Sequence, residues 1–336
     1  MSALRQVHGW LAARRRFQFV ATLVMVSALT AACGALLMLP NSVLPKLRAV
    51  APGQDSSQVT PTDPQVPQVK RTMEGYGKVV AETASTGPDR TGIVLGHSGQ
   101  QADIDVLAGE LAASTTAVTA LWGADWNQAP VVVVASSTSE FAALTHVVGD
   151  VPAEVAASTV ADPFRPGAQL TGQRVVFGPD AGRRLGADAL RSVLRHELTH
   201  MATRAVTVDG SPMWMLEGFA EYSAHRDLRH PIAQIAPTLT ARAHAGDLPA
   251  DLPPDAMFEP TSGNASLAYE QGWSACAFIA DRYGDAKLIT LYRQLASGPK
   301  DRTAIETALR TTLGVGYADF ITDWRTWLTT RTAEGA

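Results

Sequence analysis

The sequence predicts an α+β protein in which a small mixed sheet packs on a helix and is followed by a mainly helical half. Short apolar runs with strand character lie between residues 131 and 177. From about residue 186, apolar residues recur at helical spacing almost to the end of the 336-residue chain. A third observation, an uncharged stretch near the N-terminus, predicts a single transmembrane helix ahead of the folded part.

The N-terminal segment has the pattern of a signal anchor. Residues 1–16 contain four arginines and no acid, and residues 17–39 contain no charged side chain. As a helix, these 23 positions (39 − 17 + 1) span about 35 Å, enough to cross a bilayer core of about 30 Å. The one-sided arginine cluster predicts a cytoplasmic N-terminus and export of the rest. Cleavage after Ala32, or lipidation of Cys33, are the alternatives.

Composition divides the remainder of the chain. Six prolines stand among Gln, Ser, Thr and Asp in residues 40–70, which predicts an extended linker. An extracytoplasmic domain is predicted over 71–336, with an α+β part at 71–204 and a helical part at 205–336. Its core can be sizeable, because 46% of the residues are hydrophobic. The net charge of −4 argues against nucleic acid as a partner.

The α+β part begins with a helix predicted over 102–122. Pro130 then leads into an all-apolar run at 131–135, which predicts a buried strand. The serines and threonine that follow can cap a short helix ending near Val148.

Two further strands are predicted at 155–160 and at Arg174–Phe177, ahead of a helix at about 186–204. Arg174–Phe177 is the candidate for an exposed edge against which an extended peptide adds as a strand. A plain interior strand is the alternative. The helical part is predicted to contain helices near 232–245 and at 269–283, 285–297, 301–313 and 317–330.

Candidate metal ligands stand in the helix at 186–204. His196 and His200 are four positions apart, so both imidazoles lie on one helix face and can reach one ion, with Glu197 beside them. An apolar stripe on the opposite face lets the helix bury one side and present the other. The stripe consists of Leu190, Leu194, Leu198 and Met201. A solvated helix that happens to carry two histidines is the alternative.

A second segment strengthens the case for a metal. Glu217 follows His200 by 17 positions (217 − 200), within a helix-like apolar run at 214–220. A second helix packed on the first brings this carboxylate to the same ion. Two histidines, one carboxylate and one open position are the usual protein contribution to the zinc site of a hydrolase.

The two segments, His-Glu-Leu-Thr-His at 196–200 and Trp-Met-Leu-Glu-Gly-Phe-Ala-Glu-Tyr at 214–222, resemble the gluzincin metallopeptidases. The nearest likeness is to the peptidase MA-like group, and a more distant one is to the zinc aminopeptidases. The resemblance covers about residues 100–330. It implies a zincin-like fold, a zinc cofactor and peptide or protein substrates. No G-x-M-E-N-type segment for gripping a substrate's amino terminus is found, so aminopeptidase specificity is not implied.

Matched residue by residue, the resemblance gives His196, His200 and Glu217 as the metal ligands and Glu197 as the general base. Glu221 matches an acid that receives the N–H of a zinc-bound imidazole in related enzymes. The alternative for Glu221 is an exposed helix acid.

A donor to the developing oxyanion is also expected. Residues 268–272, Ala-Tyr-Glu-Gln-Gly, resemble the segment that follows the third ligand in peptidase MA-like proteins, which makes Tyr269 the first candidate. Tyr222 and His225 are the further candidates. A tyrosine that only packs in the core is the alternative for Tyr269.

Two classes of function follow. The first is a membrane-anchored, extracytoplasmic zinc peptidase in which Glu197 takes a proton from water and passes it to the leaving amine. The second is a catalytically inactive gluzincin fold that serves as a binding or scaffold module at the cell surface. A zinc amidase of cell-wall peptides is a third, suggested only by the location. The intact ligands and Glu197 favour the enzyme.

Overall fold

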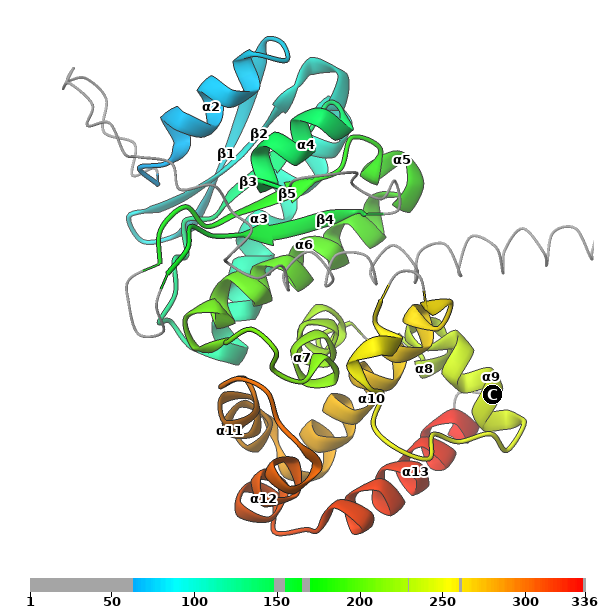
Figure 1. Ribbon diagram of the computed structural model, residues 1–336. Coiled ribbons are helices and arrows are strands. Elements are labelled where there is room, and N and C mark those ends of the chain that lie inside the picture. The colour runs from blue at the N-terminus through cyan, green and yellow to red at the C-terminus, as the bar shows by residue number, and fades with distance from the viewer. Residues whose placement is uncertain (1–62, 148–154, 165–169, 229, 260–261, 335–336) are drawn as a thin grey trace, which may run out of the picture.

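The computed structural model describes residues 63–147, 155–164, 170–228, 230–259 and 262–334. The predicted cytoplasmic segment, transmembrane helix and most of the linker lie outside these residues. Within them, one five-stranded mixed sheet is followed by a mainly helical half, which confirms the predicted fold class (Figure 1). The strands are β1 (Val79–Gly87), β2 (Arg90–His97), β3 (Val131–Val134), β4 (Ala157–Val160) and β5 (Arg174–Phe177).

Helices cover both faces of the sheet. The residues of β3 alternate between the two layers: Val132 and Val134 pack on one side, Val131 and Val133 on the other. All four valines are fully buried, as expected for a strand with a core on both faces. One layer consists of α3 (Gln101–Trp122) and α6 (Ala187–Thr203), and the other of α2 (Val66–Glu74) and α4 (Thr138–Thr145).

The strand order β1-β2-β3-β5-β4 places β5 inside the sheet. Val175 pairs with Val132 of β3 in parallel and with Thr159 of β4 in antiparallel register. The prediction of Arg174–Phe177 as the exposed edge is therefore wrong, and the edge strand against α6 is Ala157–Val160. The prediction assumed that the last strand before the α6 helix lies at the edge of the sheet. In the structure β5 pairs with strands on both sides, and the earlier strand β4 forms the edge.

The structure also adds elements that the sequence pattern did not reveal. β1 and β2 form a hairpin whose outer strand mixes apolar and polar residues without alternation, and only one of its nine residues is buried. Helix α2 shows that the predicted linker boundary at residue 70 is too late, because Val66, Val69 and Met73 are buried against the sheet. A further short helix, α5 (Ala181–Leu185), leads from β5 to α6.

The helical half agrees with the predicted elements except near residue 236. The single helix predicted at 232–245 is two short helices, because Pro237 cannot continue the first and instead begins the second. The helices are α7 (Met213–His225), α8 (Ile232–Ile235), α9 (Pro237–His244), α10 (Ala265–Tyr283), α11 (Asp285–Leu295), α12 (Arg302–Leu313) and α13 (Tyr317–Glu334).

Helices α7 and α10 cross at a contact between two glycines. A Cβ on Gly218 would lie within 3.0 Å of three backbone atoms of Gly272, and a Cβ on Gly272 would lie 3.0 Å from the carbonyl oxygen of Trp214. Only glycine at both positions lets the two backbones approach this closely. Because Gly218 directly follows Glu217, the crossing also fixes the place of the Glu217 carboxylate.

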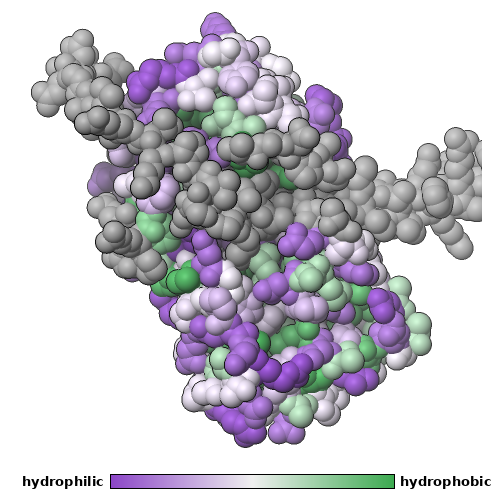
Figure 2. Space-filling view, viewed as in Figure 1, coloured by the Kyte–Doolittle hydropathy of each residue, from purple (hydrophilic) through white to green (hydrophobic). Residues whose placement is uncertain are grey.

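The described surface is mixed in character. Figure 2 shows hydrophilic residues over both halves of the face in view, interrupted by small apolar areas. Tyr76 is the one large hydrophobic side chain that is exposed among the described residues. Within the same residues, Ser98–Trp122 is the one helix long and apolar enough to cross a membrane. It contains α3, which packs against the sheet and α6.

The glycine crossing predicts an effect on stability. We expect Gly218→Ala to lower the free energy of unfolding by about 1–3 kcal/mol or more, because the added methyl group meets backbone that cannot rotate away. Gly109→Ala is the matched control: it changes an exposed glycine of α3 with no atom within 4 Å of the added Cβ, and should stabilise the protein slightly. Denaturant unfolding of the full chain in mild detergent measures both. Equal midpoints for wild type and Gly218→Ala would contradict the crossing.

Candidate metal centre

Helix α6 carries the first part of the site. Its apolar stripe is buried as predicted, with all four residues at most 1% exposed. The opposite face is also closed, because α7 packs across His196 and His200, while Glu197 contacts Thr159 of β4; all three motif side chains are buried. The histidines therefore face a helix–helix interface instead of an open helix surface.

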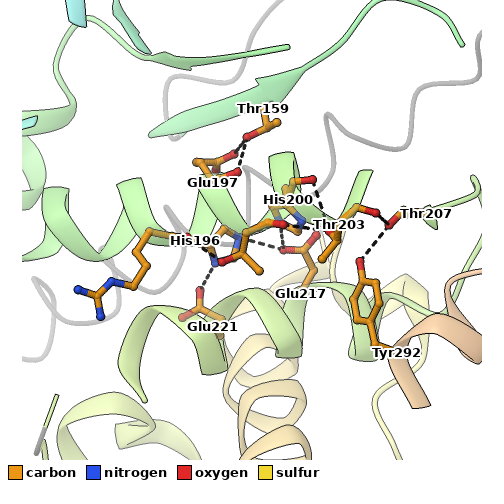
Figure 3. A network of polar contacts seen from close by, with 11 residues as sticks. Thr159, His196, Glu197, His200, Thr203, Thr207, Glu217, Glu221 and Tyr292 are labelled. Atoms are coloured by element: carbon orange, nitrogen blue, oxygen red, sulfur yellow. Dashed lines mark hydrogen bonds and ion pairs between the residues drawn. The ribbon is translucent and has the colours of Figure 1, made fainter. Parts of the chain in front are cut away.

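Helix α7 brings Glu217 to the two histidines (Figure 3). The Nε2 atoms of His196 and His200 lie 3.0 Å apart, and Oε2 of Glu217 lies 3.3 Å from the first and 3.5 Å from the second. One ligand atom from each residue falls within 4.8 Å of the others. The spacing of 17 residues between His200 and Glu217 thus includes the end of α6, a connection over 204–212 that begins with a short 3-10 helix, and the first turn of α7.

This donor set fits a zinc ion. Both carboxylate oxygens of Glu217 are buried, and neither has a hydrogen-bond partner among the described residues. A buried carboxylate left without hydrogen bonds is costly unless it binds a cation. Two imidazole nitrogens and one carboxylate oxygen are ligands that zinc prefers, and three protein ligands leave a coordination position open.

The charges at the cluster are strongly coupled. Burial by itself would raise the pKa of Glu217, but the charge of His200 and contacts with both imidazoles lower it to about 2. The carboxylate is therefore ionised at neutral pH. Burial would lower the pKa of His196, yet the carboxylates of Glu217 and Glu221 raise it well above its usual value. Binding of a metal through His196 consequently releases a proton.

Glu221 lies on the other side of His196, where the resemblance implied a supporting acid. Its Oε1 is 3.2 Å from Nδ1 of His196, and its Oε2 is 3.4 Å from Nε2 of His225. Burial would raise the pKa of Glu221, but the two histidines hold it far below its usual value. Glu221 thus contacts both His196 and His225. Within the described residues, His225 is joined to Glu221 and makes no hydrogen bond or ion pair with the three candidate ligands.

Glu197 extends from α6 toward Thr159 of β4, and its role as general base stays a prediction (Figure 3). Its Oε2 accepts a hydrogen bond from Oγ1 of Thr159 at 2.7 Å, and the same hydroxyl lies 2.9 Å from the Glu197 backbone oxygen. Its Oε1 is buried and has no hydrogen-bond partner in the described part of the chain. One oxygen is therefore held and the other is available to accept a proton.

The tyrosine candidates occupy different environments. Tyr269 in α10 is buried, and its ring packs edge-on against Phe258 at 5.2 Å between ring centres. Its role toward an oxyanion stays a prediction. The hydroxyl of Tyr222 donates to Asp285 at 2.8 Å, and this bond ties it to the start of α11.

Sequence reasoning missed Thr159 and Tyr292. Tyr292 packs with Trp122 and Phe219 in an aromatic cluster, and its hydroxyl lies 3.0 Å from that of Thr207 (Figure 3). Burial, aided by the charge of Glu217, raises the pKa of Tyr292 to about 12. A cavity of about 20 Å³, large enough for one water, lies beside His200 and Glu217. No local sequence pattern indicates Thr159 or Tyr292, because each lies in an element that is distant in sequence from the motif.

Glu270 is a buried acid near Glu221 that sequence reasoning did not identify. Its Oε2 accepts a hydrogen bond from the backbone N–H of Leu239 at 2.5 Å, at the start of α9, while its Oε1 has no partner among the described residues. Burial raises its pKa to about 7, and the charge of Glu221 adds to the increase, against hydrogen bonds from Leu239 and Thr238.

A comparison with protein-family models agrees with the motif. Residues 187–330 match the family model described as Peptidase MA superfamily, which confirms the resemblance for that segment. The M1 zinc metallopeptidase from Deinococcus radiodurans aligns at 19% identity and a TM-score of 0.42, covering 76% of this chain and 53% of that one. A mutant of that enzyme bound to a Tyr-Ser-Ala substrate aligns at 18% identity and a TM-score of 0.42, covering 76% of this chain and 52% of that one. This chain spans about half the length of those structures. No curated protein matches.

The ligand geometry predicts metal content. We expect the full chain to bind about one zinc ion per molecule, and His200→Ala or Glu217→Ala to lose most of it, since either change leaves two protein ligands. His244→Ala is the control, because this exposed histidine of α9 contacts the Thr332 backbone oxygen instead. Elemental analysis after dialysis measures the ratio. Undiminished zinc in either variant would show that the substituted residue is not a metal ligand.

Glu270 predicts a pH dependence of stability. The folded-state pKa of about 7 exceeds the ordinary value of 4.5, so folding favours the protonated acid. The contribution of Glu270 to the free energy of unfolding should therefore fall as the pH rises from about 4.5 through 7. Glu270→Gln keeps a neutral side chain, and the difference in stability between variant and wild type should grow over that range. Unfolding at a series of pH values tests this; a difference independent of pH would contradict it.

Proposed function

We propose that this protein is a zinc-dependent metallopeptidase that acts outside the cytoplasm on peptide bonds while anchored to the membrane. The observation that carries the proposal is the convergence of His196, His200 and Glu217 on one point, with the unpartnered Oε1 of Glu197 one residue along the helix. The match of residues 187–330 to the Peptidase MA superfamily supports the same class. Retention of Glu197, which is not needed to bind the metal, favours the enzyme over an inactive scaffold.

The three ligands would hold zinc, which when bound polarises a carbonyl and activates water for attack on it. Glu197 supplies the base: its buried carboxylate accepts a proton through Oε1 and returns it to the leaving amine. Glu221 fixes the ring of His196 through Nδ1, so that Nε2 faces the other ligands. The hydroxyl of Tyr269 would donate a hydrogen bond to the developing oxyanion.

Glu197→Gln separates an enzyme from a scaffold. We expect the variant to keep fold and zinc but to lose about 10²–10⁴-fold in turnover, because an amide cannot shuttle the proton. The measurement uses a peptide, found by library profiling, that the wild type cleaves in a chelator-sensitive way. Cleavage by Glu197→Gln at the wild-type rate would disprove the mechanism. If zinc is bound and no peptide in a broad library is cleaved, the scaffold function takes its place.

Tyr269→Phe tests the oxyanion donor. Turnover should fall by about 10²–10³-fold without loss of zinc, because only a hydroxyl is removed. Tyr76→Phe is the matched control, since this exposed tyrosine contacts the Ser139 backbone oxygen in another part of the fold. Equal turnover for Tyr269→Phe and wild type would leave the residue a packing role.

The proposed topology has its own test. Residues 40–336 should lie outside the cytoplasm, and the full chain should stay in the membrane after a carbonate wash, because 17–39 is uncharged and flanked by arginines on one side. Protease added to intact cells, with any wall removed, should degrade the protein. Extraction by carbonate, or complete protection from the protease, would show that the topology is wrong.

A further inference from the structure

We infer that Thr159 is a positioning residue for the proposed general base: its hydroxyl holds Oε2 of Glu197 and thereby orients the carboxylate, leaving Oε1 as the proton acceptor. The inference rests on the proposed function for its kinetic consequence. The contact itself is independent of that function. Thr159 comes from the edge strand β4 and Glu197 from helix α6, so the bond also joins the sheet to the metal-binding helix.

The environment of the carboxylate leaves few other ways to orient it. Glu197 is fully buried, and the Thr159 hydroxyl, 2.7 Å from Oε2, is its one side-chain hydrogen-bond partner among the described residues. A glutamate side chain has several rotatable bonds, so without a partner its carboxylate would sample several directions. The hydrogen bond on Oε2, together with the close packing around this buried side chain, restricts the direction of Oε1.

The position of Thr159 in the sheet makes it a rigid holder. Its backbone pairs with Val175 in the antiparallel ladder between β4 and β5, and its side chain is 2% exposed. A β-branched side chain has a restricted χ1 angle, so the hydroxyl has a defined direction. The adjacent Ser158 points to the other face, and its buried hydroxyl has no partner in the described part of the chain.

The Thr159 hydroxyl has one proton and two acceptors within reach, Oε2 at 2.7 Å and the Glu197 backbone oxygen at 2.9 Å. A bond to the backbone oxygen alone would only dock the strand on the helix. A bond to Oε2 makes Thr159 part of the catalytic arrangement. The shorter distance and the charge of the carboxylate favour Oε2.

The kinetic test compares Thr159→Val, Thr159→Ser and wild type as full chains in detergent. Valine keeps the shape and removes the hydroxyl, so kcat should fall by about 10–100-fold while KM and zinc content stay near wild type. Serine should restore most of the activity. Thr145→Val is the matched control, because that buried hydroxyl of α4 bonds only backbone oxygens of its own helix and its loss should leave kcat unchanged. Unchanged kcat in Thr159→Val would overturn the inference.

A double-mutant cycle separates positioning from general destabilisation. In a Glu197→Gln background no carboxylate remains to be aimed, so adding Thr159→Val should change residual turnover by less than about 3-fold. A loss as large as that in the wild-type background would overturn the inference and assign Thr159 a structural role.

A second cycle does not depend on activity. If the hydroxyl is held by the carboxylate, Thr159→Val should raise the unfolding equilibrium constant by about 10-fold or more in wild type, and by clearly less in Glu197→Ala. Equal effects in both backgrounds would mean that the backbone oxygen is the partner, and the inference would fail. Absence of peptide cleavage by zinc-loaded wild type would instead refute the proposed function, while this cycle would still decide the contact.

Discussion

The structure depends on burying an ionic cluster between two helices. His196, His200 and Glu217 are enclosed where α6 and α7 pack, and the carboxylate has no hydrogen-bond partner of its own among the described residues. Burying charged groups in this way costs free energy unless they compensate one another or hold a cation. In this cluster the carboxylate and the imidazoles compensate one another, since the pKa of Glu217 is lowered and that of His196 is raised. An ion bound by these atoms would add its binding free energy to folding.

Apolar packing elsewhere in the fold holds α6 and α7 against each other. On one side, α6 packs on the sheet and on α3, and its stripe of apolar residues is buried there. On the other side, α7 packs on α10 through the contact of Gly218 with Gly272. The Trp122, Phe219 and Tyr292 rings join α3, α7 and α11 close to Glu217. Each helix is thus held by apolar packing away from the charges.

Support for the polar residues comes from α7, which carries part of the motif, and from the sheet, which carries none of it. Glu221 contacts the second nitrogen of His196, and Thr159 reaches Glu197 from the edge of the sheet. This division explains why the sheet belongs to the site although its strands hold none of the three proposed ligands. The sheet offers a rigid surface on which the α6 side chains take one orientation.

The local sequence determined the class of fold, the extent of α6 and the metal-binding pattern. Periodicity of 3.6 predicted α6, and the i, i+4 spacing of His196 and His200 followed from helix geometry. The outer strand β1, the interior position of β5 and the roles of Thr159 and Tyr292 were decided only by the tertiary structure. Helical patterns arise from residues a few positions apart, and a sequence displays them directly. Strand order and hydroxyl contacts join residues tens of positions apart, so they exist only once the chain has folded.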